Sequence, residues 1–164
     1  MIDTPSTHEK LLVLLDGRSV TYRVIEHAAE GRSEHISRIR GNHPAQALKA
    51  LVVSVRGGGH GRRTVLAVVP GNRALDMKGL LATLGAQKGR FAPPELASQM
   101  TGCVMGAVPP FSFRADLVVL ADPAIRDNAE VVFNAGRLDR SIFMAGDDYV
   151  AIADPLFAGI ATAE

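Results

Sequence analysis

The sequence predicts a single mixed α+β domain over residues 1–164, with a mixed, largely antiparallel sheet flanked by short helices. Two apolar runs, Ala50–Val55 and Thr64–Val69, are joined by the glycine-rich turn Gly57–Gly61, which is typical of an antiparallel hairpin. Strand-like and helix-like segments are mixed along the chain, whereas a regular parallel array would need longer crossover helices. The 164 residues, 47% of them hydrophobic, suit one domain with one core.

The N-terminal part of the chain predicts a helix, a strand and a second helix. Ser6–Glu9 has the sequence of a capping box, the leucines that follow have helical spacing, and Gly17 is expected to end the helix. Val20–Glu26 alternates and contains β-branched residues, so we expect a strand there. Ser33–Arg40 predicts a short helix that Gly41 stops.

Beyond the hairpin, helical patterns and short apolar runs are mixed. Asp76–Leu84 predicts a helix with Asp76 near its start and Gly85 beyond its end, and Pro94–Met100 predicts a second short helix. Asp147–Ala153 is expected to be a last helix or strand. Three further strands are expected at Leu117–Ala121, Val131–Phe133 and Ser141–Phe143.

The longest stretch without a charged residue is Leu96–Phe113, which is 18 residues long. This length approaches the ~20 apolar residues of a membrane-spanning helix. Two glycines, two adjacent prolines and several polar residues interrupt the stretch, so a helix in contact with lipid is excluded. We therefore expect a loop that binds a ligand, and no membrane as a partner.

The net charge is +1, but the charges are unevenly distributed along the chain. Residues 31–63 carry seven Lys and Arg residues against one Glu, a balance of +6, whereas residues 114–164 have a balance of −5. A local basic block suits the docking of one part of a polyanion, and no DNA partner is expected. A solvated surface without a partner explains the same charges equally well.

Cysteine and histidine content limits the compartment and the cofactors. Cys103 is the only cysteine, and the five histidines share no metal-binding spacing, so no metal site and no cofactor are expected. Cys103 itself is expected to be a small buried residue and not a nucleophile. No secretory signal is visible at the start, and a reduced cytoplasmic location is the default expectation.

Three separated blocks of the sequence resemble a known family. The blocks are Gln46–Val53 (QALKALVV), Gly102–Phe111 (GCVMGAVPPF) and Phe133–Gly136 (FNAG). Their order and spacing resemble the YbaK/prolyl-tRNA synthetase-associated editing-domain family, and the likeness extends over roughly residues 11–153. Within that family, the second and third blocks are most similar to free-standing YeaK-like members of the ProXp type.

The resemblance implies the family's curved or barrel-like sheet and the activity of a trans-editing aminoacyl-tRNA deacylase. Such an enzyme hydrolyses the ester of tRNA mischarged with a small amino acid, here serine, threonine or an alanine-like amino acid. The implied partner is the acceptor end of the mischarged tRNA, with or without a synthetase. Two alternatives stay open: a non-catalytic module that binds tRNA or an aminoacyl-adenylate analogue, and a metal-dependent hydrolase.

Lys49 is the first candidate site residue. It lies within an apolar run, where an ammonium group is costly unless it reaches water or an anion. The resemblance implies a pocket lysine near the aminoacyl ester and the phosphate of the terminal adenosine. Physically, its charge would position an anionic group or stabilise developing negative charge. Without the resemblance, a strand-edge lysine that extends to solvent is the simpler explanation.

The loop rich in glycine and proline is the second candidate. Glycine lets the backbone approach a ligand, and the resemblance implies that Gly102 and Gly106 hold the ester carbonyl and the attacking water through backbone groups. Pro109 is expected to stiffen the loop. Val104 and Ala107 would leave room for only a small amino acid. A tight buried turn would show the same short motif.

Four further residues are predicted to bind substrate. His27 follows a strand and would contact the tRNA terminus or the amino acid, although a histidine at a strand end is more often simply hydrogen-bonded. Ser33 matches a position where the family has a small hydroxyl residue. Asn134 and Gly136 resemble the family's late pocket wall, with the Asn amide as donor and acceptor. A turn before the next strand is the alternative for this pair.

Arg38 and Arg40 complete the set of predicted site residues. Both lie on the predicted helix Ser33–Arg40, within the basic block. They are candidates for phosphate contacts with the acceptor stem of the tRNA. A solvated helix face explains them almost equally well.

Overall fold

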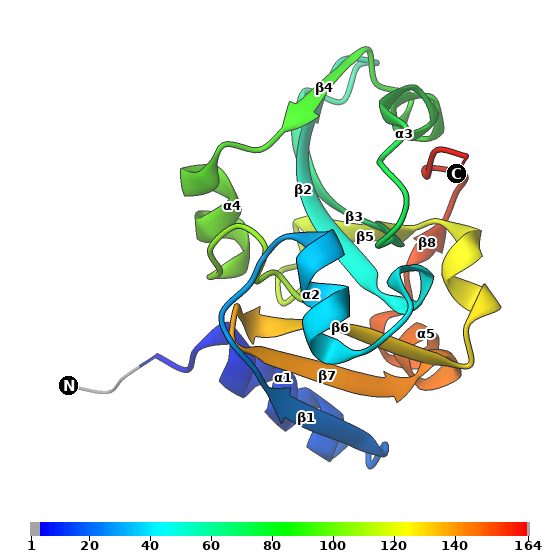
Figure 1. The fold of residues 1–164 in the computed structure, drawn as a ribbon. Helices are drawn as coiled ribbons and strands as arrows, with labels where there is room; N and C mark the ends of the chain where they lie inside the picture. Colours follow the sequence, from blue (N-terminus) through cyan, green and yellow to red (C-terminus); the bar gives the residue numbers. More distant parts are fainter. Residues whose placement is uncertain (1–3, 164) are drawn as a thin grey trace.

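The computed structural model describes residues 4–163, in which eight strands form two sheets around a shared core. The smaller sheet is antiparallel and has the order β1-β7-β6 (Figure 1). Its strands are β1 (Tyr22–Glu26), β7 (Arg140–Ala145) and β6 (Glu130–Arg137). The strand register shifts between Asn134 and Arg137, so β6 bends where its last residues approach the loop after α4.

The larger sheet is mixed and has the order β4-β2-β3-β5-β8. The hairpin of β2 and β3 pairs antiparallel along its whole length, β4 adds to β2 antiparallel, and β5 and β8 continue the sheet in parallel. The strands are β2 (Leu48–Arg56), β3 (Arg62–Pro70), β4 (Lys88–Phe91), β5 (Leu117–Ala121) and β8 (Leu156–Phe157).

Short helices connect and cover the sheets. Local sequence sets their ends: the Ser6 hydroxyl accepts from the Glu9 N–H at 3.1 Å, and Gly41, Gly85 and Gly102 end three helices in the left-handed conformation. The α-helices are α1 (Thr7–Gly17), α2 (Ser33–Arg40), α3 (Met77–Leu84), α4 (Pro94–Thr101) and α5 (Gly146–Ala153), and the 3₁₀ helices are η1 (Pro44–Gln46) and η2 (Pro123–Asp127).

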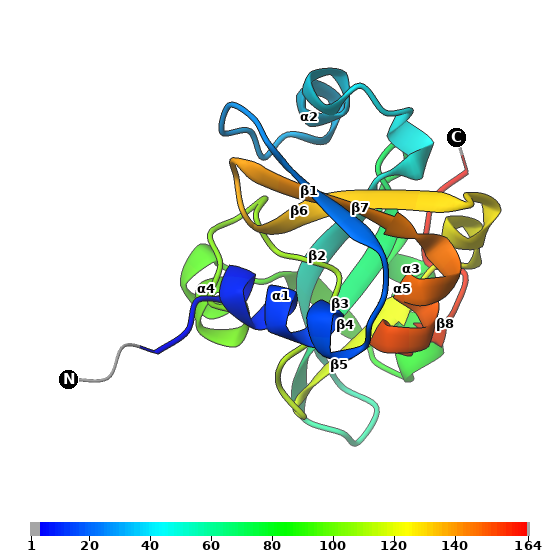
Figure 2. The same cartoon turned by 90° about the horizontal axis from the view of Figure 1, so that it is seen from below.

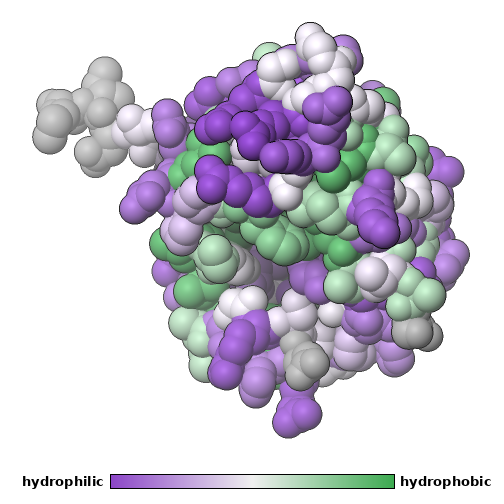
Figure 3. Space-filling model, turned by 90° about the horizontal axis from the view of Figure 1, so that it is seen from above, coloured by the Kyte–Doolittle hydropathy of each residue, from purple (hydrophilic) through white to green (hydrophobic). Residues whose placement is uncertain are grey.

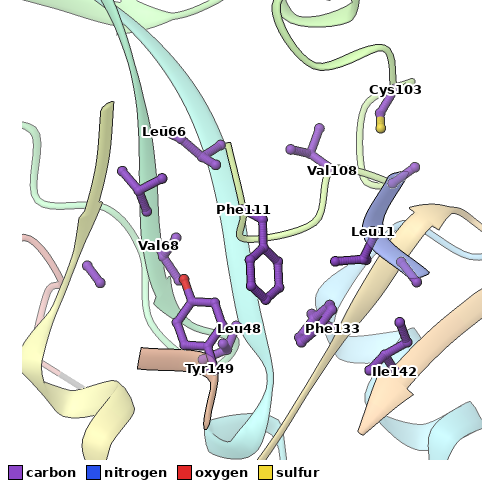
Figure 4. Close-up of a cluster of buried hydrophobic side chains, with 14 of the residues drawn as sticks. Leu11, Leu48, Leu66, Val68, Cys103, Val108, Phe111, Phe133, Ile142 and Tyr149 are labelled. Atoms are coloured by element: carbon purple, nitrogen blue, oxygen red, sulfur yellow. The ribbon is translucent and has the colours of Figure 1, made fainter. Parts of the chain in front are cut away.

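The main core lies between the two sheets, with α1 against the smaller sheet (Figure 2). Phe111, Phe133 and Tyr149 pack at its centre, with ring centroids 5.6 Å apart for the phenylalanines and 5.1 Å for Phe111 and Tyr149 (Figure 4). The Tyr149 hydroxyl donates to the Pro110 carbonyl at 2.7 Å. These contacts fix the C-terminal half of the glycine- and proline-rich loop to the core.

The predicted fold class is confirmed, and the differences are local. The strands divide between two sheets, and the sequence prediction missed β4 and β8. The segment Asn134–Gly136, for which a turn was the alternative, continues β6. Asp147–Ala153, for which a helix or a strand was predicted, is helical. No helix among the described residues has the length and apolar character needed to cross a membrane.

Candidate functional site

One pocket of about 400 Å³ lies between α2, β2 and the loop after α4, and Figure 3 shows a hollow on this face of the molecule. Its walls are mostly apolar, and four polar or charged side chains reach it. The apolar side chains are Ile36, Ala47, Leu48, Ala50, Leu51, Val52, Phe91, Ala92, Ala97, Met105 and Val108, and the polar ones are Ser33, Arg40, Lys49 and Asn134. The structure thus brings together five of the predicted site residues, these four and Gly106.

Lys49 lies on β2, and its ammonium group donates to the Arg73 carbonyl at 2.6 Å. Among the described side chains and the backbone of residues 4–163 this is its one hydrogen bond, and an ammonium group can donate up to three. Burial lowers the pKa of Lys49 below the ordinary lysine range, because an apolar environment disfavours the charged form. A cation held in this way gains more from an anionic ligand than an exposed one.

Arg40 brings a second cation to the same pocket from the last turn of α2. Burial lowers the pKa of its guanidinium to about 10, so the group still carries its charge at neutral pH. Its Nε donates to Asn42 at 3.1 Å and its Nη1 lies 3.4 Å from the Ser141 hydroxyl. No carboxylate is among the described lining residues. The described part of the lining therefore carries two cations within apolar walls.

Asn134 joins two loops at the wall of the pocket. Its amide nitrogen donates to the carbonyls of Gly106 at 2.7 Å and Glu30 at 3.2 Å. Its Oδ1 accepts from the hydroxyl of Ser141 at 3.0 Å. Because all three bonds use the buried side chain, Asn134 fixes the loop around Gly106 against the loop before α2.

His27 lies behind Asn134 and not in the pocket lining. Its Nε2 is 2.7 Å from the Ser141 hydroxyl and its Nδ1 is 2.8 Å from the Ala28 carbonyl. The chain of bonds from His27 through Ser141 therefore ends on Asn134. In this geometry His27 supports the pocket wall, and direct contact with substrate stays a prediction.

Gly106 and Gly31 cross at the pocket in close backbone contact. Gly106 has φ 88°, and a Cβ atom at this position would lie 2.8 Å from the Gly31 Cα. The same residue offers its carbonyl to Asn134. Glycine is thus required here both for conformation and for the closeness of the two chain segments.

Gly102 and Gly136 lie outside the pocket lining and have structural roles. A Cβ on Gly102 would lie 2.6 Å from Thr7 Oγ1, where the end of α4 meets the start of α1. A Cβ on Gly136 would lie 2.8 Å from the His8 backbone nitrogen. The Gly136 N–H donates to the Ala107 carbonyl at 2.9 Å, which holds the loop beside β6.

The remaining predicted loop residues do not line the pocket. Val104 is 61% exposed, whereas Ala107 and Pro109 are buried. Their neighbours Met105 and Val108 supply the apolar wall instead. Arg38 is exposed on α2 and also stays outside the lining.

Phe91 and Met105 are pocket residues that sequence reasoning missed. Their side chains are 56% and 65% exposed although both are large and apolar. Phe91 ends the unpredicted strand β4, and Met105 lies inside the loop that was already a candidate. Exposed apolar side chains around a hollow are typical of a ligand site.

Metal ligation has no support among residues 4–163, which contain no group of three or more His, Cys, Asp or Glu side chains placed to hold an ion. Cys103 is buried, and burial raises the pKa of its thiol, so a reactive thiolate is disfavoured. The described lining offers two cations, an amide and a hydroxyl group, and the loop backbone as its polar groups.

Solved structures share this fold. Hypothetical protein APE2540 superposes with a TM-score of 0.83 at 19% identity, covering 94% of this chain and 100% of that one. A candidate trans-editing enzyme for prolyl tRNA synthetase superposes with a TM-score of 0.80 at 22% identity, covering 98% and 100%. At these identities the likeness shows the fold alone.

Sequence relatives define the class of protein. "Multifunctional Ser/Thr-tRNA deacylase ProXp-y" of Escherichia coli K12, and that of strain O157:H7, are each 39% identical over 150 residues, covering 91% of this chain and 89% of theirs. The relatives and the family model together place this chain in the class of aminoacyl-tRNA editing domains, as the resemblance predicted. Residues 27–152 match the aminoacyl-tRNA editing domain, and the chain belongs to that family.

Proposed function

We propose that this protein hydrolyses the ester of tRNA mischarged with serine or threonine, and that Lys49 is the cation that positions the substrate. The observation that supports this best is the pocket itself, in which Lys49 and Arg40 lie in apolar walls with the polar groups of Ser33 and Asn134. The proposed specificity for serine and threonine is supported by the 39% identity to a Ser/Thr-tRNA deacylase.

The reaction needs no redox or group-transfer partner. Water attacks the ester carbonyl carbon, the bond from that carbon to the ribose oxygen breaks, and the ribose oxygen leaves with a proton. The products are the free amino acid and the tRNA with its terminal hydroxyl restored. The ester is already activated, and the neighbouring ribose hydroxyl is available to assist the proton transfer.

Positioning and electrostatics carry the proposed catalysis, because no carboxylate or histidine side chain is among the described lining residues. The Lys49 ammonium would hold the terminal phosphate or the developing oxyanion in low-dielectric surroundings, where charge stabilisation is strongest. The backbone at Gly106 reaches the pocket and would orient the carbonyl and the water. Gly102 would act only through the conformation of the loop.

The proposed partner is the acceptor end of the mischarged tRNA. The two pocket cations suit the phosphate next to the terminal adenosine, and Arg38 is exposed two residues before Arg40 on α2, within reach of solvent-side phosphates. We propose that a synthetase is not needed for hydrolysis itself and that the protein acts in the cytoplasm, where aminoacyl-tRNA is made.

Ser33 is our candidate for reading the hydroxyl group of the bound amino acid. It lines the pocket, and its own hydroxyl has no hydrogen-bond partner among the described side chains and the backbone carbonyls of residues 4–163. We expect Ser33→Ala to lower the ratio of kcat/KM for seryl-tRNA over alanyl-tRNA about tenfold, the value of one hydrogen bond. Ser98→Ala, on the exposed side of α4, is the control and should leave the ratio unchanged. An unchanged ratio in Ser33→Ala would remove this role.

The alkaline limb of the pH profile should report the charge of Lys49. Because burial lowers its pKa, we expect kcat/KM to fall with rising pH before the ordinary lysine range is reached. In Lys49→Arg the guanidinium, which is intrinsically the weaker acid, keeps its proton to higher pH than the ammonium in the same surroundings, so the fall should move to higher pH even if the rate is lower. Initial rates, corrected for spontaneous ester hydrolysis, test this. Identical limbs in both proteins would contradict it.

A panel of substrates tests the proposed function as a whole. One mischarged tRNA is prepared per small amino acid, and initial deacylation rates are measured with purified protein in the absence of synthetase, with and without EDTA. We expect turnover of seryl- and threonyl-tRNA that survives EDTA. Binding of tRNA without turnover of any substrate would favour the non-catalytic alternative, and loss of turnover in EDTA would favour the metal-dependent one.

A further inference from the structure

Four cationic side chains gather on the larger sheet outside the pocket. Arg62 on β3 lies opposite Arg56 on β2, and Arg56 lies opposite Lys88 on β4, so three cations form one row across three strands. Arg90 lies two residues further along β4, opposite Ser54. Cross-strand partners share a face, so all four side chains start from the same side of the sheet. We call these four residues the basic row.

The basic row surrounds a hollow and is not neutralised. A cavity of about 330 Å³ is lined by these four residues with Ser54, Val55 and Gly89. All four side chains are exposed, and none has an ion pair or a side-chain hydrogen bond with any residue in the described part of the chain. Elsewhere, by contrast, Arg114 and Arg137 pair with acidic neighbours at 2.8 Å and 2.9 Å.

The sequence around the basic row offers no acidic compensation. Residues 35–75 contain no Asp or Glu, and neither do residues 77–94. Like charges placed directly opposite each other destabilise a sheet. A row of cations without counter-charges is therefore a cost to folding, which an external polyanion would relieve.

The basic row and the pocket are connected along one strand. Ala50 and Val52 line the pocket, and Ser54 and Arg56 follow at the two-residue spacing that keeps side chains on the same face of β2. From Ala50 to Arg56 the strand rises about 20 Å at ~3.3 Å per residue. Measured against the rise of about 3.4 Å per nucleotide of one B-form DNA strand, this separation corresponds to roughly six nucleotides. Figure 3 shows hydrophilic surface next to the hollow.

We propose that Arg56, Arg62, Lys88 and Arg90 bind the phosphate backbone of the tRNA acceptor arm while its aminoacylated 3′ end occupies the pocket. The inference rests on the proposed function, because it locates the remainder of the same substrate. An RNA backbone is favoured over an acidic protein because the cations line a hollow that continues along β2 from the pocket proposed to hold the aminoacylated end of the tRNA. Such a backbone can be bound through its phosphates without base-specific contacts.

The double variant Arg56→Gln/Lys88→Gln tests the proposal against Lys10→Gln/Arg18→Gln, which removes the same charge from α1 and the residue that follows it. Two substrates are compared: the full-length mischarged tRNA and a short 3′-aminoacyl-CCA oligonucleotide that reaches only the pocket. We expect kcat/KM on tRNA to fall at least about tenfold in the test variant, with the short substrate changed less than about twofold. The slope of log kcat/KM against log salt should become shallower by about 1.5.

Affinity for uncharged tRNA provides a readout that does not need turnover. Filter binding should show a Kd about tenfold weaker in the test variant and unchanged in the control, with equal melting temperatures in both. Equal losses on both substrates, or unchanged affinity for tRNA, would overturn the proposal and leave the proposed function intact. Absence of deacylation in the wild type would instead reject the proposed function, and the binding measurement would still decide on the basic row.

Discussion

Replacing Lys49 by Met should lower kcat/KM for seryl-tRNA by about 10²–10³-fold, the range found when one charge-stabilising donor is removed from an active site. The side chain keeps its length and loses its cation, so the apolar part of its packing survives. Most of the loss should be in kcat, because an ammonium in apolar walls stabilises a developing oxyanion more than the neutral ester. Initial rates over a range of tRNA concentrations separate kcat from KM.

The control for this variant is Lys10→Met, which removes an exposed lysine from α1. Stability should change by only about 1 kcal/mol in Lys49→Met, because one hydrogen bond to the Arg73 carbonyl is lost at a half-buried position. Urea denaturation checks that the rate loss is not unfolding. A rate within threefold of the wild type would remove Lys49 from the mechanism.

The hairpin and the helix ends could be predicted because their signals are local. The β2–β3 hairpin follows from two apolar runs around a glycine-rich turn, and Ser6, Gly41 and Gly85 mark helix ends by their own conformational preferences. Strand β4 lacked such a signal. Its sequence KGRF is short, polar and contains glycine, and it becomes a strand only by pairing with β2.

The pocket was predicted in part. Lys49 and Asn134 were predicted through the order of the resembling sequence blocks and not through strand alternation, and both line the pocket. The loop after α4 has no strand period, and its lining residues are Met105 and Val108, each one position from the predicted Val104 and Ala107. Which side of an irregular loop faces a ligand is decided by its contacts with distant segments, here the Tyr149 hydroxyl and Asn134.

The basic row could be predicted from the sequence only in part. Arg56 was visible as part of a basic block, but Lys88 and Arg90 lie outside that block, on the strand that the sequence did not reveal. Their juxtaposition depends on the register of β4 against β2. The distribution of charge along the sequence therefore identified about half of the residues of the basic row. The others became apparent only from the pairing of β4 with β2 in the structure.

Replacing Asn134 by Asp should damage both the fold and the reaction, although the two side chains have the same shape. The amide donates to the carbonyls of Gly106 and Glu30, and a carboxylate has no proton to donate. Two carbonyls would then face a buried negative charge, which we expect to cost about 2–4 kcal/mol of unfolding free energy. The change is measured as a shift in the urea midpoint.

The loss of activity in Asn134→Asp should exceed the loss that instability explains. The amide holds the Gly106 loop at the pocket wall, and in the variant the new carboxylate would compete with the substrate for the ammonium group of Lys49. We expect kcat/KM to fall about 10²-fold under conditions where the variant is folded. Asn128→Asp is the matched control, since its amide also donates to a backbone carbonyl, that of Ala45 at 2.9 Å, but outside the pocket. It should lose stability and keep the kcat/KM of the folded enzyme. Equal activity in the two variants would mean that the Asn134 amide contributes only to folding, and the orientation of the loop backbone would no longer belong to the mechanism.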